Sequence, residues 1–83
     1  MSPDVLLVLP SIHDVLAAEE QVRDAGLWVD LLPKPGCIGT DCGMVLGCRA
    51  DDLAAVLERL RGGGLTVLGT WRVTPGGCER LGP

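Results

Sequence analysis

Residues 5–32 read VLLVLPSIHDVLAAEEQVRDAGLWVDLL, and this stretch decides the fold class. The unbroken apolar run at residues 5–9 is typical of a strand that is buried on both faces. Ser11 then opens a pattern of apolar residues three and four positions apart, which predicts an amphipathic helix over residues 12–25. Residues 27–32 again have strand character. The stretch therefore predicts a strand, a helix and a second strand.

The second half of the chain repeats this order. Residues 44–49 have strand character, and residues 65–73 predict a further strand. Between them, apolar residues follow the spacing of one helix face: Leu53, Val56, Leu57 and Leu60. The order β-α-β-β-α-β predicts an α+β fold, a ferredoxin-like sandwich with antiparallel sheet order 4-1-3-2 and two helices on one face. We expect residues 1–73 to form a single domain and residues 74–83, rich in Gly and Pro, to form a flexible tail.

Composition narrows the classes of function. The chain has 83 residues, of which 47% are hydrophobic, so it is expected to pack around one core. Its net charge is −4 and its seven basic residues are scattered, so a nucleic-acid partner is not expected. The apolar runs are too short for a bilayer span or an export signal, which predicts a cytoplasmic protein with no membrane partner. The four cysteines are accordingly expected as reduced thiols.

Residues 33–43 read PKPGCIGTDCG, and their prolines and glycines predict an exposed loop. In the predicted topology this loop lies at the end of the sheet where the first helix begins. Cys37 and Cys42 belong to the loop. We therefore expect both thiols to lie near Ser11 and His13.

Cys42 is the candidate reactive thiol. The thiolate is the nucleophile in sulfur chemistry, and a helix N-terminus or a cationic histidine favours it. His13 and the helix that begins after Ser11 are the expected sources of these effects, and Gly43 permits close backbone approach. Cys37, five residues before Cys42, is a candidate resolving thiol that would form a disulfide with it.

Other interpretations of the cysteines stay open. Cys42 can be a surface cysteine without chemistry. Cys37, Cys42 and His13 form an alternative metal site, although C-x4-C is not a common zinc spacing. Cys48 is expected in the core, and Cys78 is expected to be incidental. The topology places both of these residues at the end of the sheet opposite Cys42.

Three short motifs occur in a characteristic order. They are Pro10-Ser11-Ile12-His13-Asp14 after the first strand, Pro33-Lys34-Pro35 followed by Cys42-Gly43, and Asp51-Asp52-Leu53 at the second helix. In this order and spacing, the chain resembles the selenium/sulfur-carrier-like family of small bacterial and archaeal domains. The resemblance covers residues 5–73. It implies that Cys42, the cysteine before the glycine, is the carrier residue.

The resemblance implies a carrier that holds a persulfide-type sulfur or selenium atom on Cys42 for transfer to a partner enzyme. The expected partners are donor and acceptor proteins, and exposed sheet edges make a homodimer conceivable. The sequence has no Ser-His-Asp set and no dinucleotide fingerprint, so we expect neither an enzyme nor a cofactor. The alternative is a noncatalytic module that senses a metal or ligand, or binds another protein.

Overall fold

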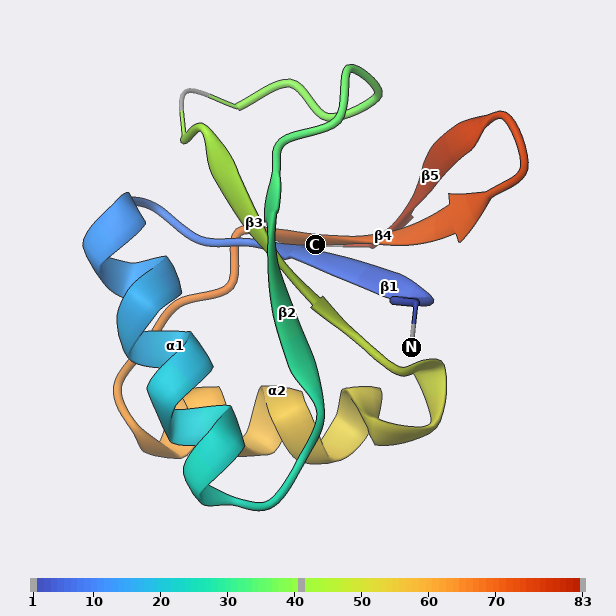
Figure 1. The fold of residues 1–83 in the computed structure, drawn as a ribbon. Helices are drawn as coiled ribbons and strands as arrows, with labels where there is room; N and C mark the ends of the chain where they lie inside the picture. Colours follow the sequence, from blue (N-terminus) through green and yellow to red (C-terminus); the bar gives the residue numbers. More distant parts are fainter. Residues whose placement is uncertain (1, 41, 83) are drawn as a thin grey trace.

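The computed structural model describes residues 2–40 and 42–82. Over these residues the chain forms five antiparallel strands and two α-helices (Figure 1). The elements in chain order are β1 (Val5–Val8), α1 (Ile12–Asp24), β2 (Val29–Pro33), β3 (Met44–Cys48), a 3-10 turn (Ala50–Asp52), α2 (Leu53–Gly62), β4 (Gly69–Thr74) and β5 (Gly77–Gly82).

The strands stand in the order β2-β3-β1-β4-β5, and every neighbouring pair is antiparallel. The prediction of an α+β fold with an antiparallel sheet is confirmed. The predicted four-strand order 4-1-3-2 does not describe the whole sheet, because β5 adds a position outside β4. Strand β1 consequently lies in the middle of the sheet, between β3 and β4.

The flexible tail predicted for residues 74–83 is a strand over most of its length. The chain turns at Pro75-Gly76, and β5 runs back along β4. Two side-chain contacts join these strands: the Arg72–Glu79 ion pair, and the Arg80 guanidinium 5.0 Å from the centroid of the Trp71 ring. A Pro-Gly dipeptide between β-forming residues marks a hairpin, and cross-strand pairs of this kind stabilise one.

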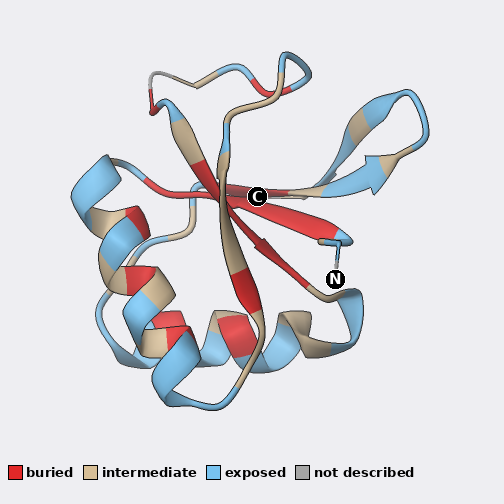
Figure 2. Ribbon diagram, in the orientation of Figure 1, coloured by how far each residue is buried: buried red, intermediate tan, exposed pale blue. Residues whose placement is uncertain are grey.

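Helices α1 and α2 cover the same face of the sheet, and the main core lies beneath them (Figure 2). Helix residues with no exposed surface in this core are Val15, Ala18, Val22, Val56 and Leu60. They cluster with strand residues such as Leu7 and Leu46. Leu53 and Leu57 pack at the margin of the cluster, so the predicted apolar face of α2 is confirmed.

The opposite face of β1 is covered by a loop. Its buried cluster contains Leu6, Val8, Ile38 and Val45. Ile38 comes from the loop between β2 and β3 and is only 1% exposed. Figure 1 shows this loop above the sheet, with the tip of the β4–β5 hairpin rising beside it. The loop is therefore part of the packed structure, although it has no regular secondary structure.

Replacing Leu60 with Ala is expected to lower the free energy of unfolding by about 2 to 5 kcal/mol, because a fully buried side chain leaves a cavity. Leu57→Ala should cost less, since Leu57 is only partly buried. Leu16, which is 47% exposed, provides the matched control, and Leu16→Ala should stay within about 0.5 kcal/mol of the wild type. Urea unfolding measures all three variants. A Leu60→Ala cost no larger than that of Leu16→Ala would contradict this packing of α2.

Candidate functional site

The four cysteines form one disulfide and two free thiols. Cys37 of the loop is bonded to Cys78 of β5, with 5.9 Å between their Cα atoms, whereas Cys42 and Cys48 are free. The predicted pairing of Cys37 with Cys42 as a resolving thiol is therefore wrong. The expectations of an incidental Cys78 and of four reduced thiols are wrong as well. The reason is the hairpin: β5 carries Cys78 back toward the loop instead of leaving it in a tail.

Cys42 is folded inward at the end of the loop. It is 8% exposed and belongs to the core cluster beneath the helices. Its Sγ donates a hydrogen bond to the Met44 carbonyl oxygen at 3.3 Å, and its N–H donates to Thr40 Oγ1 at 3.4 Å. A thiolate has no proton to donate, so this arrangement holds the protonated thiol. The expectation of an openly exposed Cys42 is wrong in this conformation.

The strand pairing places Cys42 at the end of the sheet where α1 begins. Pro33 pairs with Met44 where β2 ends and β3 begins, and this is also the end that β1 reaches before α1. Cys48 pairs with Val5 at the other end of β3. The predicted separation of Cys42 from Cys48 is confirmed.

Two predicted neighbours of Cys42 lie at this end of the sheet. Ser11 is the N-cap of α1: its Oγ accepts the Asp14 N–H at 3.3 Å and donates to the Asp14 carboxylate at 3.1 Å. His13 is exposed on the first turn of the helix. The structure shows the Cys42 thiol hydrogen-bonded to a backbone carbonyl and not to His13. A role of His13 in activating the thiol stays a prediction.

Lys34 and Ile38 shape the loop that follows β2. The sequence indicated Lys34 only as part of the Pro33-Lys34-Pro35 motif, and sequence reasoning did not single out Ile38. Lys34 Nζ donates to the Ile38 carbonyl at 3.1 Å, and the Lys34 N–H donates to the Gly43 carbonyl at 2.9 Å. Gly43 itself is exposed, and a side chain there would meet open space. The available signal was Ile38, a large apolar residue isolated among polar residues, glycines and prolines.

The alternative metal site built from Cys37, Cys42 and His13 does not form. The sulfur of Cys37 is bonded to Cys78 and is not a thiolate ligand. Within residues 2–40 and 42–82, no three His, Cys, Asp or Glu side chains gather in a group that could hold a metal ion.

Cys48 is a core thiol, as predicted. It has no exposed surface, and burial raises the pKa of its thiol from an ordinary value of 9.0 to about 11. The negative charges of Asp52 and Asp4 contribute a smaller part of this increase in pKa. Cys48 is therefore protonated at neutral pH and poorly suited to nucleophilic attack.

A protein-family model described as "Putative Se/S carrier protein-like" matches residues 4–72. The chain belongs to this family. The matched residues include Cys42 and also Cys37, which lies in the same loop and is bonded to Cys78. Cys78 and the whole of β5 lie beyond them. No curated protein and no solved structure gave a significant match to the chain.

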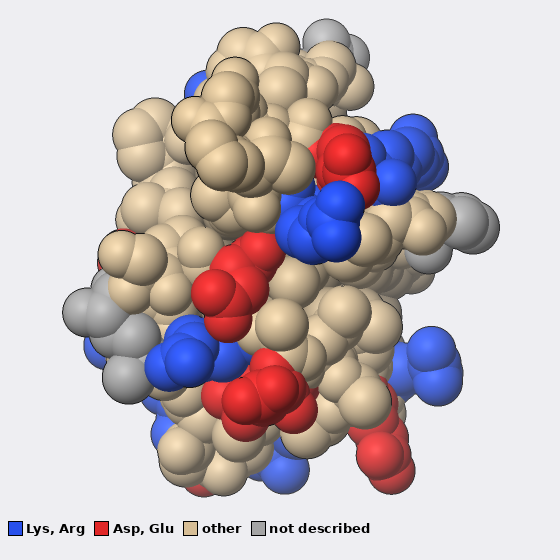
Figure 3. Space-filling view, turned by 90° about the vertical axis from the view of Figure 1, so that its right-hand side faces the viewer, with Lys and Arg blue, Asp and Glu red and all other residues tan. Residues whose placement is uncertain are grey.

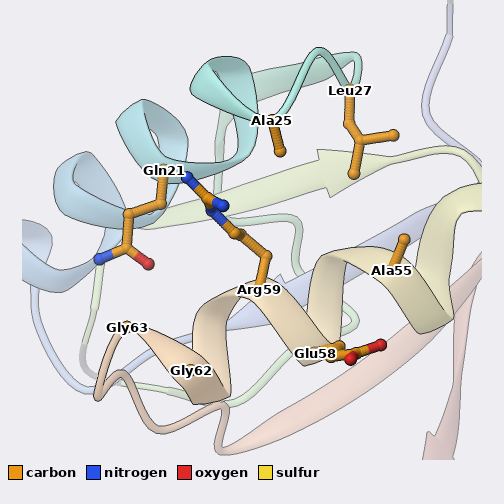
Figure 4. Close-up of a pocket in the computed structure, with 8 residues that line it drawn as sticks. All are labelled: Gln21, Ala25, Leu27, Ala55, Glu58, Arg59, Gly62 and Gly63. Atoms are coloured by element: carbon orange, nitrogen blue, oxygen red, sulfur yellow. The ribbon is translucent and has the colours of Figure 1, made fainter.

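A cavity of about 650 Å³ lies between α1 and α2 (Figure 4). Arg59 extends from α2 toward α1, and Gln21 extends from α1 toward Gly63. The Gln21 Oε1 atom is buried without a hydrogen-bond partner. The lining includes no cysteine and no residue of the loop at 34–43. The cavity is therefore separate from the thiol site.

The surface on the side of the β4–β5 hairpin carries mixed charge. Figure 3 shows acidic and basic side chains interspersed on this face, with no broad area of one sign. The view gives no sign of the continuous basic surface that a phosphate backbone requires. No helix in the described ranges combines the length and the apolar character needed to span a bilayer.

Raising the pH through the alkaline range should destabilise the fold through Cys48. The unfolded thiol ionises near 9.0 and the folded one at about 11, so the unfolded state loses its proton first and the free energy of unfolding falls as pH rises between these values. The full loss is about 2 to 3 kcal/mol, from the size of the pKa difference. Urea unfolding below and above this window measures it.

Cys48→Ala should show a shallower alkaline decline, because it lacks the group responsible, and Cys42→Ala serves as the matched control. If Cys48→Ala and the wild type lost stability equally over this pH window, the assigned pKa of Cys48 would be contradicted.

Proposed function

We propose that this protein carries a sulfur or selenium atom on Cys42 and delivers it to a partner enzyme. Family membership supports the identity of the cargo. The state of the four sulfur atoms is the observation that carries the proposal. The disulfide occupies Cys37 and Cys78, and Cys48 is fully buried in the sheet. Cys42 is thus the free thiol that lies in a loop at the end of the sheet.

Loading and delivery are sulfur transfers without net oxidation. The Cys42 thiolate attacks the outer sulfur of a donor persulfide, and a sulfur–sulfur bond forms on Cys42 as the donor's bond breaks. The proton of the Cys42 thiol goes to the departing donor thiolate. A nucleophile of the acceptor then attacks the terminal sulfur and returns Cys42 as a thiolate. Selenium in place of the outer sulfur follows the same course, and catalytic groups are supplied by the donor and acceptor proteins.

Delivery requires Cys42 to turn outward, and its position makes this a local movement. The direct contacts that hold the Cys42 side chain inward are its hydrogen bond to the Met44 carbonyl and the burial of this one small side chain. A typical hydrogen bond contributes about 1 kcal/mol net, so local opening of an irregular loop is accessible. Exposing Cys48 would instead require β3 to separate from β1 and β2, its neighbours in the sheet.

Incubating the oxidised protein with glutathione persulfide should add the mass of one sulfur atom to the Cys42 peptide, because Cys42 is the free thiol that local opening of the loop exposes. Mass spectrometry of a non-reducing digest measures this addition, and dithiothreitol should remove it. In a parallel incubation with selenodiglutathione, the Cys42 thiol should displace one glutathione, and the Cys42 peptide should gain the mass of selenium with the remaining glutathione.

Cys42→Ser should abolish sulfur loading, and Cys48→Ala, the matched control, should retain it. If both the wild type and Cys37→Ser/Cys78→Ser, which lacks the disulfide, remained unloaded, Cys42 would be ruled out as the carrier. Loading mainly on Cys48 would rule it out as well.

A further inference from the structure

The loop at residues 34–43 is anchored on both faces of the sheet. Ile38 enters the cluster on the face away from the helices, and Cys42 enters the cluster beneath them. These two residues, four positions apart in the sequence, therefore pack against opposite faces of the sheet. A force that holds Ile38 in place also restrains Cys42, because only a short segment separates them.

Most hydrogen bonds of this loop are internal to it. They join Lys34 to Ile38, Lys34 to Gly43, and Ile38 to Pro35. Such bonds preserve the shape of the loop, but they do not attach it to the rest of the molecule. The attachments near its tip are the buried side chain of Ile38 and the disulfide of Cys37.

The disulfide joins the loop to the outermost part of the fold. Cys37 lies against the hairpin backbone, since a side chain on Gly77 would come within 3.7 Å of its Cβ. Cys78 belongs to β5, which is an edge strand. The main core cluster beneath α1 and α2 contains neither of the bonded cysteines. The bond thus constrains the loop and the hairpin without forming part of the central packing.

We propose that the Cys37–Cys78 disulfide is a reducible latch that keeps the loop closed and Cys42 inward. Its reductant is a dithiol, either a small dithiol protein or dithiothreitol. One thiolate of the dithiol attacks the Cys37 sulfur, a mixed disulfide forms, and Cys78 leaves as a thiolate. The second thiol of the reductant then attacks the mixed disulfide and releases Cys37. The protein gains two electrons and two protons, and the reductant becomes a disulfide.

The exposure of the two sulfur-bearing residues sets the direction of attack. Cys37 is exposed, whereas Cys78 is half-buried at the margin of the cluster that contains Ile38. A dithiol therefore reaches Cys37 first, and Cys78 becomes the leaving group. Access to the attacked sulfur is one of the factors that control the rate of thiol–disulfide exchange.

Reduction leaves the burial of Ile38 as the remaining attachment of the loop tip. The loop then opens more often, and Cys42 loses its contacts with the core in the open state. The importance of this latch for delivery rests on the proposed function of Cys42 as the carrier. Its effect on access to the thiol does not depend on what Cys42 carries.

The test compares iodoacetamide labelling rates at Cys42 and Cys48 within the same digest. Three samples are used: oxidised wild type, wild type reduced with dithiothreitol, and Cys37→Ser/Cys78→Ser, which lacks the bond without adding thiols. Cys42 should react at least about tenfold faster in the second and third samples, as expected for a local opening. Cys48 reports global unfolding, because it has no exposed surface and belongs to the main core cluster beneath the helices.

An unchanged Cys42 rate would overturn the latch. An equal increase in the labelling rates of Cys42 and Cys48 would also overturn the latch, because the disulfide would then stabilise the whole fold and not the loop alone. The labelling test and the sulfur-loading test fail independently. If Cys42 loads sulfur equally with and without the disulfide, the carrier proposal stands and the latch proposal is wrong. If the labelling rate responds to reduction but Cys42 never loads sulfur, the latch proposal stands and the carrier proposal is wrong.

Discussion

The structure depends on one constraint: strand β1 is buried on both faces. All residues of Val5–Val8 are buried, so each face of the sheet requires an apolar cover. Helices α1 and α2 supply one cover with a continuous cluster of aliphatic side chains. The other cover is much thinner and includes Ile38, with Trp71 and Cys78 at its margin. A loop that carries a candidate reactive thiol therefore also covers the smaller core cluster on one face of the sheet, which links the accessibility of Cys42 to the packing of the sheet.

The parts of the fold that follow from local periodicity could be predicted from the sequence. Strand β1 and helices α1 and α2 are encoded by the spacing of apolar residues within short segments. The burial of Cys48 follows from alternation along β3. The shared location of Cys42 and the beginning of α1 follows from the strand connections, since handedness rules restrict the possible arrangements. Each of these features needs only nearest-neighbour information or a general rule of chain topology.

The remainder depends on contacts between distant segments, which local patterns do not specify. Glycines and prolines mark turns and irregular chain alike, so residues 74–83 are compatible with both a tail and a hairpin. Once β5 forms, the hairpin comes beside the loop and Cys78 becomes the partner of Cys37. The inward position of Cys42 has a similar origin, because it requires a core cavity made by residues from several elements. Sequence spacing alone favoured Cys42 as the disulfide partner of Cys37. In the folded chain Cys78, which is farther away in the sequence, is the partner.

The central position of β1 also governs how the chain can acquire its structure during synthesis. This strand precedes both of its neighbours in the chain: β3 and β4 are encoded far downstream, and β4 comes after both helices. Pairings between distant segments form slowly, because chain entropy is lost before the contacts compensate for it. An emerging N-terminal half has no partner for either edge of its most apolar segment. The native sheet can close only when the residues of β4 have left the ribosome, and until then β1 presents the nascent chain's main risk of aggregation.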